Sequence, residues 1–270
     1  AGDRLIGSIG SVFVGEYFDF DVVDDEFGTS IAKGDFNDDG IDDIVIGSHT
    51  GVCDAGSCGA AYVFFGPHEQ GTEKYLDEAD FMIYNDTAND HLSHHMLGPG
   101  DINGDGTDDL LVSTDLGAIG GDVVAGAVLL YSGETIEGFP IETGNAGESD
   151  ALVTIHGAAL GSLFGATVGV VPGVDGEAPK MVIGAPNASN PDSTSDSHEG
   201  AVYGFYGPWE AGTRTADAMT RTLYGSEFNA TLGASLAVGD VQADGVIDIV
   251  VGEPSVDKVY VLPATDWLFD

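Results

Sequence analysis

The chain has 270 residues, of which 46 are Asp or Glu and only 7 are Lys or Arg, so its formal net charge is −39. This charge excludes nucleic acid as a natural partner and argues against docking on anionic lipid, because both need Lys and Arg on the binding surface. Disorder is not expected, since 43% of the residues are hydrophobic and the chain is long enough for a large core.

The excess of acidic residues also indicates the solvent that the chain needs. Self-repulsion destabilises a compact state unless salt screens the charges. The composition resembles that of proteins from halophiles that accumulate salt, such as haloarchaea. An acidic protein of ordinary habitat, or one that stores cations, remains an alternative at this point.

Short strands bounded by Gly, Pro and Asp are predicted along the whole chain, and no stretch keeps a helical period. Residues 10–15 and the residues around Phe18 are predicted as the third and fourth strands of a partial unit. Four segments then align without gaps, starting at Phe27, Ser93, Phe164 and Leu232. Each unit of about 68 residues contains four predicted strands, the first being the segment that begins with Phe-Gly.

Four strands in each evenly spaced repeat predict an all-β chain that folds as a β-propeller with four-stranded antiparallel blades. About four to five blades are expected within a single domain, residues 1–270. The units are a partial blade, 1–26, and blades 27–92, 93–163, 164–231 and 232–270. A parallel β-helix is the structural alternative, but its rungs are far shorter than these repeats.

The first unit places oxygen-bearing residues at alternate positions around a glycine turn at Gly40. Alternating oxygen donors and a sharp turn can enclose a hard cation, and Ca²⁺ fits better than Mg²⁺, which demands strict octahedral geometry. The second and fourth units repeat the pattern. The predicted calcium ligands are Asp35, Asn37, Asp39, the Ile41 carbonyl and Asp43; Asp101, Asn103, Asp105, the Thr107 carbonyl and Asp109; and Asp240, Gln242, Asp244, the Val246 carbonyl and Asp248.

The third unit is predicted to bind no calcium. It has Pro172, Val174, Gly176 and Lys180 at the ligand positions, and therefore brings a cation to the position that closes the other loops. The fourth-unit loop is predicted to be the weakest of the three sites, because Gln242 is one methylene longer than Asn. Chance clustering in an Asp-rich surface does not explain the fixed spacing of the loops from the strands that follow them.

The order Phe27-Gly28, Gly34-Asp35, Asp-x-Asn-x-Asp-Gly-x-x-Asp and Ile-Val-Ile-Gly resembles the FG-GAP repeat. That repeat builds the β-propeller of integrin alpha subunits and occurs in bacterial and archaeal surface proteins. The resemblance recurs four times over nearly the whole chain, although Ser93 and His94 replace Phe-Gly in the second unit. It implies an extracellular propeller without catalytic residues, used in adhesion or protein recognition, with calcium stiffening its loops.

The Asp clusters and the histidines could suggest an active site, but each has a non-catalytic explanation. The Asp clusters are better explained by a cation than by an acid–base pair, which needs one carboxyl group with a raised pKa. His91, His94 and His95 are close in sequence, but adjacent strand residues point to opposite faces, so packing and channel-lining roles are expected. His49, His68, His156 and His198 are predicted to be isolated loop or surface residues.

Other features concern the environment of the chain. Cys53 and Cys58 are predicted to form a loop disulfide, with half of a metal site as the alternative. Three Asn-x-Ser/Thr sequons, at Asn85, Asn187 and Asn229, could accept glycans. Chance alone would give one or two such motifs in a chain of this length, so they are weak evidence for glycosylation. No apolar run is long enough to span a membrane, and the chain opens at Ala1 without a signal peptide.

Two functional alternatives remain beside adhesion or recognition of a protein or cell-surface partner. One is a glycan-active or lipid-active propeller enzyme, or its accessory domain, which a cluster of His, Asp and aromatic residues at the channel mouth would favour. The other is a structural surface-layer component. The last unit stops after its third strand. Either the N-terminal strands complete it and close a ring of four to five blades, or the chain is an open part of a larger propeller. An unclosed propeller exposes strand edges and blade faces, which favours association with another copy.

Overall fold

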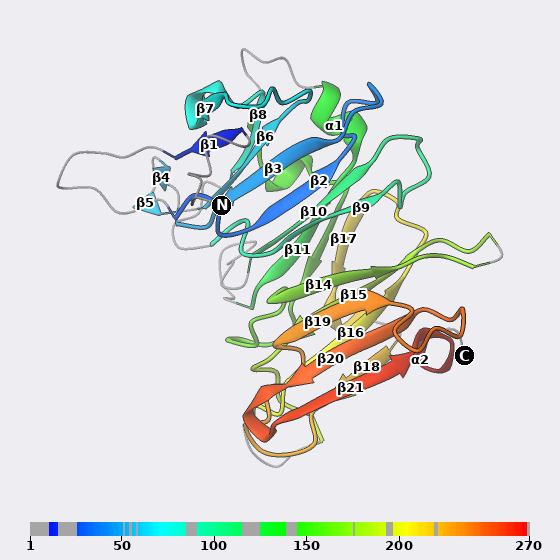
Figure 1. Ribbon diagram of the computed structural model, residues 1–270. Coiled ribbons are helices and arrows are strands. Elements are labelled where there is room, and N and C mark those ends of the chain that lie inside the picture. Colours follow the sequence, from blue (N-terminus) through cyan, green and yellow to red (C-terminus); the bar gives the residue numbers. More distant parts are fainter. Residues whose placement is uncertain are drawn as a thin grey trace, which may run out of the picture.

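The computed structural model describes residues 11–15, 26–50, 52–53, 56–57, 59–84, 91–114, 125–138, 145–174, 176–192, 197–218 and 221–268. Within these residues the chain is an all-β β-propeller whose four main sheets, the blades, lie one after another in chain order (Figure 1). The innermost strands of the blades, β2, β9, β14 and β19, follow one another along the same side of the molecule.

The first three blades have four antiparallel strands each, in chain order from the inside outward. The first contains β2 (Ile31–Gly34), β3 (Asp43–Ser48), β6 (Ala60–Phe64) and β8 (Phe81–Tyr84). The second contains β9 (Met96–Gly100), β10 (Asp109–Thr114), β11 (Ala127–Tyr131) and β13 (Val153–His156). The third contains β14 (Thr167–Val171), β15 (Lys180–Ala185), β16 (Ala201–Tyr206) and β18 (Arg221–Tyr224).

The fourth blade has three strands, and its outer strand is missing from the described residues. It contains β19 (Ser235–Gly239), β20 (Asp248–Glu253) and β21 (Lys258–Pro263). The helices are short: α1 (Gly133–Gly138), α2 (Ala264–Leu268) and the 3-10 turns Leu76–Glu78, Glu148–Asp150, Ala216–Ala218 and Pro254–Val256.

Short segments after the third strand of a unit reach back to the preceding blade. β12 (Asn145–Ala146) pairs parallel with β8, and β17 (Gly212–Thr215) pairs parallel with β13. β7 (Glu73–Tyr75) pairs in the same way with β1 (Val12–Val14). These parallel pairs connect each unit to the one before it. In them β1 takes the place that the outer strands β8 and β13 take in their pairs. A small hairpin of β4 (Val52–Cys53) and β5 (Gly56–Ser57) lies outside the blades.

The core lies between the blades, because the central strands are apolar on both faces. We call the face of a blade that is turned toward the next unit its forward face, and the opposite side its backward face. Forward residues of the first blade, such as Val45 and Val63, share a buried cluster with backward residues of the second, such as Val112 and Tyr131. The same arrangement joins the second blade to the third and the third to the fourth.

The inner strands approach one another closely where glycine allows it. A Cβ atom on Gly98 of β9 would lie 1.9 Å from the carbonyl oxygen of Lys33 in β2. That distance is far inside van der Waals contact, so any side chain at Gly98 would force the first two blades apart. The glycine is therefore part of the packing between neighbouring blades.

Two expectations about strands need correction. The Phe-Gly segment is a turn and not the first strand: Gly28 has a φ of +93° and Gly165 a φ of +92°, values outside the extended region. β2 and β14 begin after it. At the N-terminus, residues 10–15 were predicted as a third strand, but β1 pairs with β7 as β8 and β13 pair with their parallel neighbours, which is the pattern of an outer strand.

Candidate metal loops

The loops with predicted ligands join the inner strand of a blade to the second strand. In three of them the closing Asp pairs with the last glycine of the inner strand: Gly34 with Asp43, Gly100 with Asp109 and Gly239 with Asp248. All three closing carboxylates are fully buried. Because the same register recurs, the three loops share one backbone frame and differ mainly in their side chains.

In the first loop the carboxylates are turned toward backbone amides. Asp35 accepts hydrogen bonds from the N–H groups of Asp39, at 3.0 Å, and Gly40, at 2.8 Å. Asp39 accepts the N–H of Ile41 at 2.9 Å. The closing Asp43 accepts the N–H of Phe36 at 2.9 Å with one oxygen and that of Gly66, at the same distance, with the other.

The second loop brings its side chains closest together. The amide nitrogen of Asn103 lies 2.7 Å from an oxygen of Asp105 and 3.1 Å from one of Asp109. Asp101 accepts the N–H groups of Gly104 at 2.6 Å and Gly106 at 3.0 Å. A single neutral side chain therefore links two carboxylates of the loop.

The carboxylates of the second loop influence one another's pKa values. The pKa of Asp109 is raised to about 7: burial and, less strongly, the charges of Asp105 and Asp101 raise it, and hydrogen bonds from the backbone N–H groups of Ile102 and Asn103 lower it. Burial also raises the pKa of Asp105, but hydrogen bonds from Ser132, Thr107 and Asn103 outweigh it and lower that pKa to about 2. Several carboxylates of the loop thus lie close together, and the hydrogen bonds that they accept offset their mutual repulsion only in part.

The first loop shows the same effect at its closing position. Burial raises the pKa of Asp43, against the lowering effect of the N–H groups of Gly66 and Phe36, and the charges of Asp39 and Asp35 add to the rise. A bound cation would favour the ionised form of such a group.

The fourth loop keeps the frame with a longer amide side chain. Asp240 accepts the N–H groups of Asp244 at 3.1 Å and Gly245 at 3.0 Å. The side-chain nitrogen of Gln242 donates to Asp248 at 3.0 Å, as Asn103 does to its closing Asp. Gln242 can therefore reach the closing carboxylate in spite of its extra methylene.

The third loop contains a positive charge where the others have a carboxylate. Lys180 closes it, pairing with Val171 of the inner strand. Its ammonium group is buried, lies 2.7 Å from a carboxylate oxygen of Glu177, and sits 5.3 Å from the ring centre of Tyr206. The predicted ligand positions Pro172, Val174 and Gly176 bring no carboxylate to this loop.

The donor set of the three acidic loops suits a hard cation, since every predicted ligand atom is an oxygen. In the conformation described, however, no group of three or more His, Cys, Asp or Glu side chains is already arranged to hold a metal ion among the residues that the structure describes. The carboxylates face backbone N–H groups, so cation binding would require side chains of the loop to turn inward.

One histidine prediction is wrong. His49 is not isolated: its ring centre lies 5.6 Å from that of His91 and 6.0 Å from that of His94, and its Nε2 is 3.0 Å from Glu26. His49 follows β3, and the two other histidines precede β9, so blade packing brings the rings together. No sequence spacing could have shown this.

The remaining histidines lie apart from this group. His95 lines the groove between inner strands, and burial lowers its pKa. His94 and His95 both precede β9, so the expectation that they are adjacent residues of a strand is wrong. His156 lies within β13, and burial lowers its pKa too, so the prediction that it is a loop or surface residue is also wrong.

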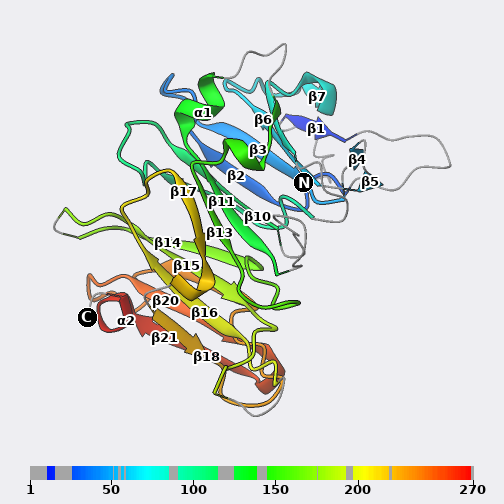
Figure 2. The ribbon, with the colours of Figure 1, turned by 180° about the vertical axis from the view of Figure 1, so that it is seen from behind.

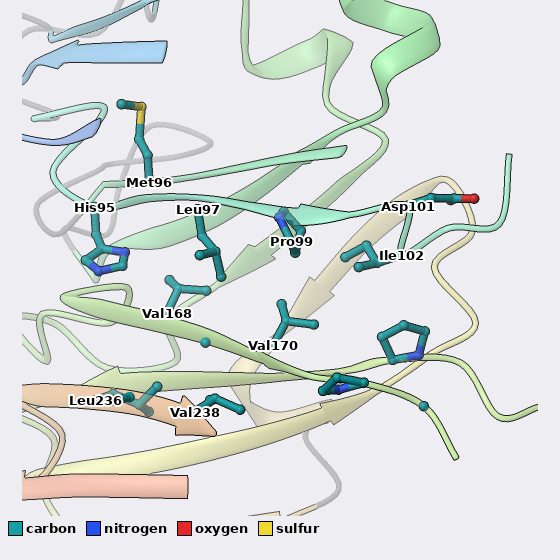
Figure 3. Close-up of a pocket in the computed structure, with 15 residues that line it drawn as sticks. His95, Met96, Leu97, Pro99, Asp101, Ile102, Val168, Val170, Leu236 and Val238 are labelled. Atoms are coloured by element: carbon teal, nitrogen blue, oxygen red, sulfur yellow. The ribbon is translucent and has the colours of Figure 1, made fainter. Parts of the chain in front are cut away.

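A groove of about 600 Å³ runs between the inner strands β9, β14 and β19. Figure 3 shows aliphatic side chains from these strands, such as Leu97, Val168 and Leu236, facing one another across it. The ionisable residues among the fifteen that line it are His95 and Asp101, which lie at opposite ends. The lining includes no aromatic side chain, so the cluster that would favour an enzyme is not found in this groove.

Contacts between neighbouring loops were missed from the sequence. Asp108 accepts the backbone N–H of Asp35 at 3.0 Å, which ties the second loop to the first. Ser132 donates to Asp105 at 2.5 Å from beyond the end of β11. Both contacts depend on how strands and blades pack, for which the sequence carries no local signal.

Comparison with known proteins agrees with this repeat. Residues 27–64 match the FG-GAP repeat. The phosphatidylinositol-glycan-specific phospholipase D of Dictyostelium discoideum is 30% identical over 167 residues, which cover 57% of this chain and 17% of that protein. The protein of the same name from Homo sapiens is 28% identical over 155 residues, covering 57% of this chain and 18% of the relative. The chain thus spans less than a fifth of the length of either relative.

The structure describes two of the three predicted glycosylation sites and one of the two cysteines of the predicted disulfide. Cys58 and Asn85 lie outside the described residues, so the Cys53–Cys58 disulfide and glycosylation at Asn85 stay predictions. Asn187 and Asn229 are described, and their glycosylation also stays a prediction. Among the described helices, none is long and apolar enough to cross a membrane.

Proposed function

We propose that this chain is a calcium-binding β-propeller that acts outside a halophilic cell in adhesion or protein recognition, without catalytic residues of its own. The observation that supports the proposal most directly is the contrast among the four loops. Three share one frame and an all-oxygen donor set, whereas the third has Lys180 paired with Glu177 in place of a closing carboxylate.

Calcium would relieve the electrostatic conflict within the acidic loops. Each closing Asp is buried, Asp43 and Asp109 are close to other carboxylates of their loops, and an uncompensated buried charge is costly. A divalent cation would let all the carboxylates of a loop stay ionised. The ammonium group of Lys180 offers a comparable positive charge within the third loop, which is why we propose that this loop needs no metal.

The role of the metal would be mechanical. Binding would fix side chains and backbone of three loops that connect inner strands to second strands. Loops held on a rigid scaffold are common recognition surfaces. The small number of Lys and Arg, 7 in the chain, favours a protein or glycan surface over an anionic one as the partner.

A second candidate follows from the relatives. Both similar proteins are named phosphatidylinositol-glycan-specific phospholipase D, so this chain could accompany a lipid-active or glycan-active enzyme as an accessory propeller. The aliphatic lining of the central groove favours an accessory role over a catalytic one for the described residues. Release of the lipid portion from a glycosylphosphatidylinositol substrate by the purified chain would favour an enzyme instead.

Calorimetric titration with CaCl₂ in molar salt tests the main proposal. Three Ca²⁺ per chain are expected. Asp39→Ala, Asp105→Ala and Asp244→Ala should each remove one. Asp42→Ala is the matched control, because Asp42 stands in the first loop beside the closing residue but pairs with Lys33. Unchanged stoichiometry in all three ligand variants, or no binding by the wild type, would contradict the proposal.

A further inference from the structure

Three imidazole rings meet where the first blade packs on the second. The ring centre of His49, which follows β3, lies 5.6 Å from that of His91 and 6.0 Å from that of His94, which both precede β9. The two blades lie side by side in both views (Figures 1 and 2) and share a buried cluster. His49 stands at the opposite end of β3 from the first acidic loop, so the histidines are separate from the predicted calcium ligands.

The backbone around these histidines recurs in other units, whereas the side chains do not. Each turn that leads into an inner strand has a residue of positive φ at the same place: Glu26 at +51°, His91 at +54°, Leu163 at +55° and Thr231 at +60°. Where the third blade packs on the fourth, this place holds Leu163 and then Thr231, and Pro186 follows β15 as His49 follows β3. The common frame therefore brings a carboxylate and imidazoles together between the first two blades but not between the last two.

Glu26 orients the ring of His49. The Nε2 atom of His49 lies 3.0 Å from a carboxylate oxygen of Glu26. A neutral imidazole that donates its Nε2–H to this carboxylate has a lone pair on Nδ1. That Nδ1 is buried and has no hydrogen-bond partner among the residues that the structure describes. Histidines that bind a metal commonly donate their other ring N–H to a carboxylate in this way, which fixes the ring and raises its basicity.

The turn that carries the other two histidines is held against the first blade. The hydroxyl of Ser93 donates to the carbonyl of Ala60 at 2.8 Å, and the hydroxyl of Ser30 donates to the carbonyl of Ser93 at 2.5 Å. Gly59 allows this approach, because a Cβ atom there would lie 2.3 Å from the carbonyl oxygen of Leu92. The packing of the blades thus fixes the backbone on which the rings stand.

The separations between the rings are close to those of a metal site. Two imidazoles on one tetrahedral zinc ion, with Zn–N bonds of about 2 Å, place their ring centres about 5 Å apart. The observed separations, 5.6 and 6.0 Å, exceed this value by about 1 Å or less. In the conformation described, these described residues do not yet form a metal site, so the rings would have to rotate about their side-chain bonds to bring the nitrogen atoms together.

We propose that His49, His91 and His94 bind a transition metal ion such as Zn²⁺, with Glu26 orienting the ring of His49. Imidazole suits Zn²⁺, whereas Ca²⁺ takes oxygen ligands, so this site and the acidic loops would select different ions. The net charge of −39 attracts cations to the chain. Because the ligands come from two blades, the ion would join the first blade to the second.

Calorimetric titration with ZnCl₂ tests the proposal on the wild-type chain in molar salt, with excess CaCl₂ to occupy the acidic loops. One Zn²⁺ per chain should bind. Glu26→Gln should raise the dissociation constant about tenfold to a hundredfold, and His49→Ala should raise it further. His198→Ala is the matched control, since His198 lies in the third unit with its Nδ1 2.9 Å from the carbonyl oxygen of Asn187. No binding by the wild type, or unchanged affinity of His49→Ala, would overturn the proposal.

Co²⁺ is a second probe that distinguishes the imidazole site from the acidic loops. Three imidazoles and a water molecule make a four-coordinate site, in which Co²⁺ absorbs visible light strongly, whereas Co²⁺ with six oxygen ligands absorbs weakly. The wild type should develop strong bands with one equivalent of CoCl₂, and His91→Ala and His94→Ala should each lose them. Far-ultraviolet circular dichroism checks that each variant folds. Weak bands in the wild type, or strong bands that persist in both variants, would contradict the proposal.

Discussion

The residues that matter most in this chain are carboxylates buried with few positive partners. Asp43, Asp109 and Asp248 close their loops, and Glu253 ends β20, all fully buried. Backbone, hydroxyl and side-chain amide donors satisfy most of these groups, because the chain has only 7 Lys and Arg; Lys258, 3.9 Å from Glu253, adds a positive charge there. The hydrogen bonds made by the ionised forms therefore decide what each group contributes to stability.

Glu253 gives a test that is independent of metal. It accepts the N–H of Ser226 at 2.5 Å, the hydroxyl of Ser226 at 3.0 Å and that of Tyr260 at 2.7 Å. Burial raises its pKa, but these bonds and the charge of Lys258 outweigh burial and lower it below 4.5. Glu253→Gln should reduce the free energy of unfolding at pH 7 by about 2 kcal/mol, measured by denaturant titration.

The pH dependence of that difference has a defined sign. A carboxyl group with a lowered pKa in the folded state stabilises the fold fully above its unfolded pKa, here 4.5, and loses this contribution as the pH falls through the folded value. The gap between wild type and Glu253→Gln should therefore close on acidification below about 4.5. Glu227→Gln, at an exposed partner of Lys258, is the control and should change little. A gap that persists in acid would contradict this assignment.

At the scale of elements, the hairpin loops show how far sequence reasoning reached. Spacing predicted which residues share a loop, because ligand positions and strand starts are local in sequence. It did not predict the group of His49, His91 and His94, or the contact of Asp108 with the neighbouring loop, because both form where blades meet. It also mistook the Phe-Gly turn for a strand, since the positive φ of Gly28 has no signal beyond the glycine itself.

The fourth-unit loop tests the importance of side-chain length at the third position. Gln242 donates to Asp248 at 3.0 Å, whereas Asn103 reaches two carboxylates of its loop. If the fourth loop binds calcium as proposed, Gln242→Asn should tighten this site, which is predicted to be the weakest, and calorimetry should show a several-fold lower dissociation constant for it. Glu177→Gln in the third loop is the control and should leave calcium binding unchanged. A weaker fourth site after Gln242→Asn would argue against the predicted ligand geometry.

At the scale of the whole molecule, the repeat explains the fold and the position of the acidic loops, whereas the net charge indicates the solvent. The repeat accounts for the blades and places three acidic loops at equivalent positions. Nine acidic residues are predicted there as ligands, so metal binding would leave most of the 46 Asp and Glu unexplained. We propose that the remainder reflects a salty environment, in which screening allows the blades to pack.

The central claim is that calcium stabilises this propeller through its three acidic loops. Thermal unfolding in about 1 M KCl, where surface charges are screened, tests it most directly when the chain is melted with CaCl₂ and with a chelator. The wild type should melt at a clearly higher temperature with Ca²⁺, and the triple variant Asp39→Ala, Asp105→Ala, Asp244→Ala should lose that rise. Equal melting temperatures of the wild type with and without Ca²⁺ would contradict the claim.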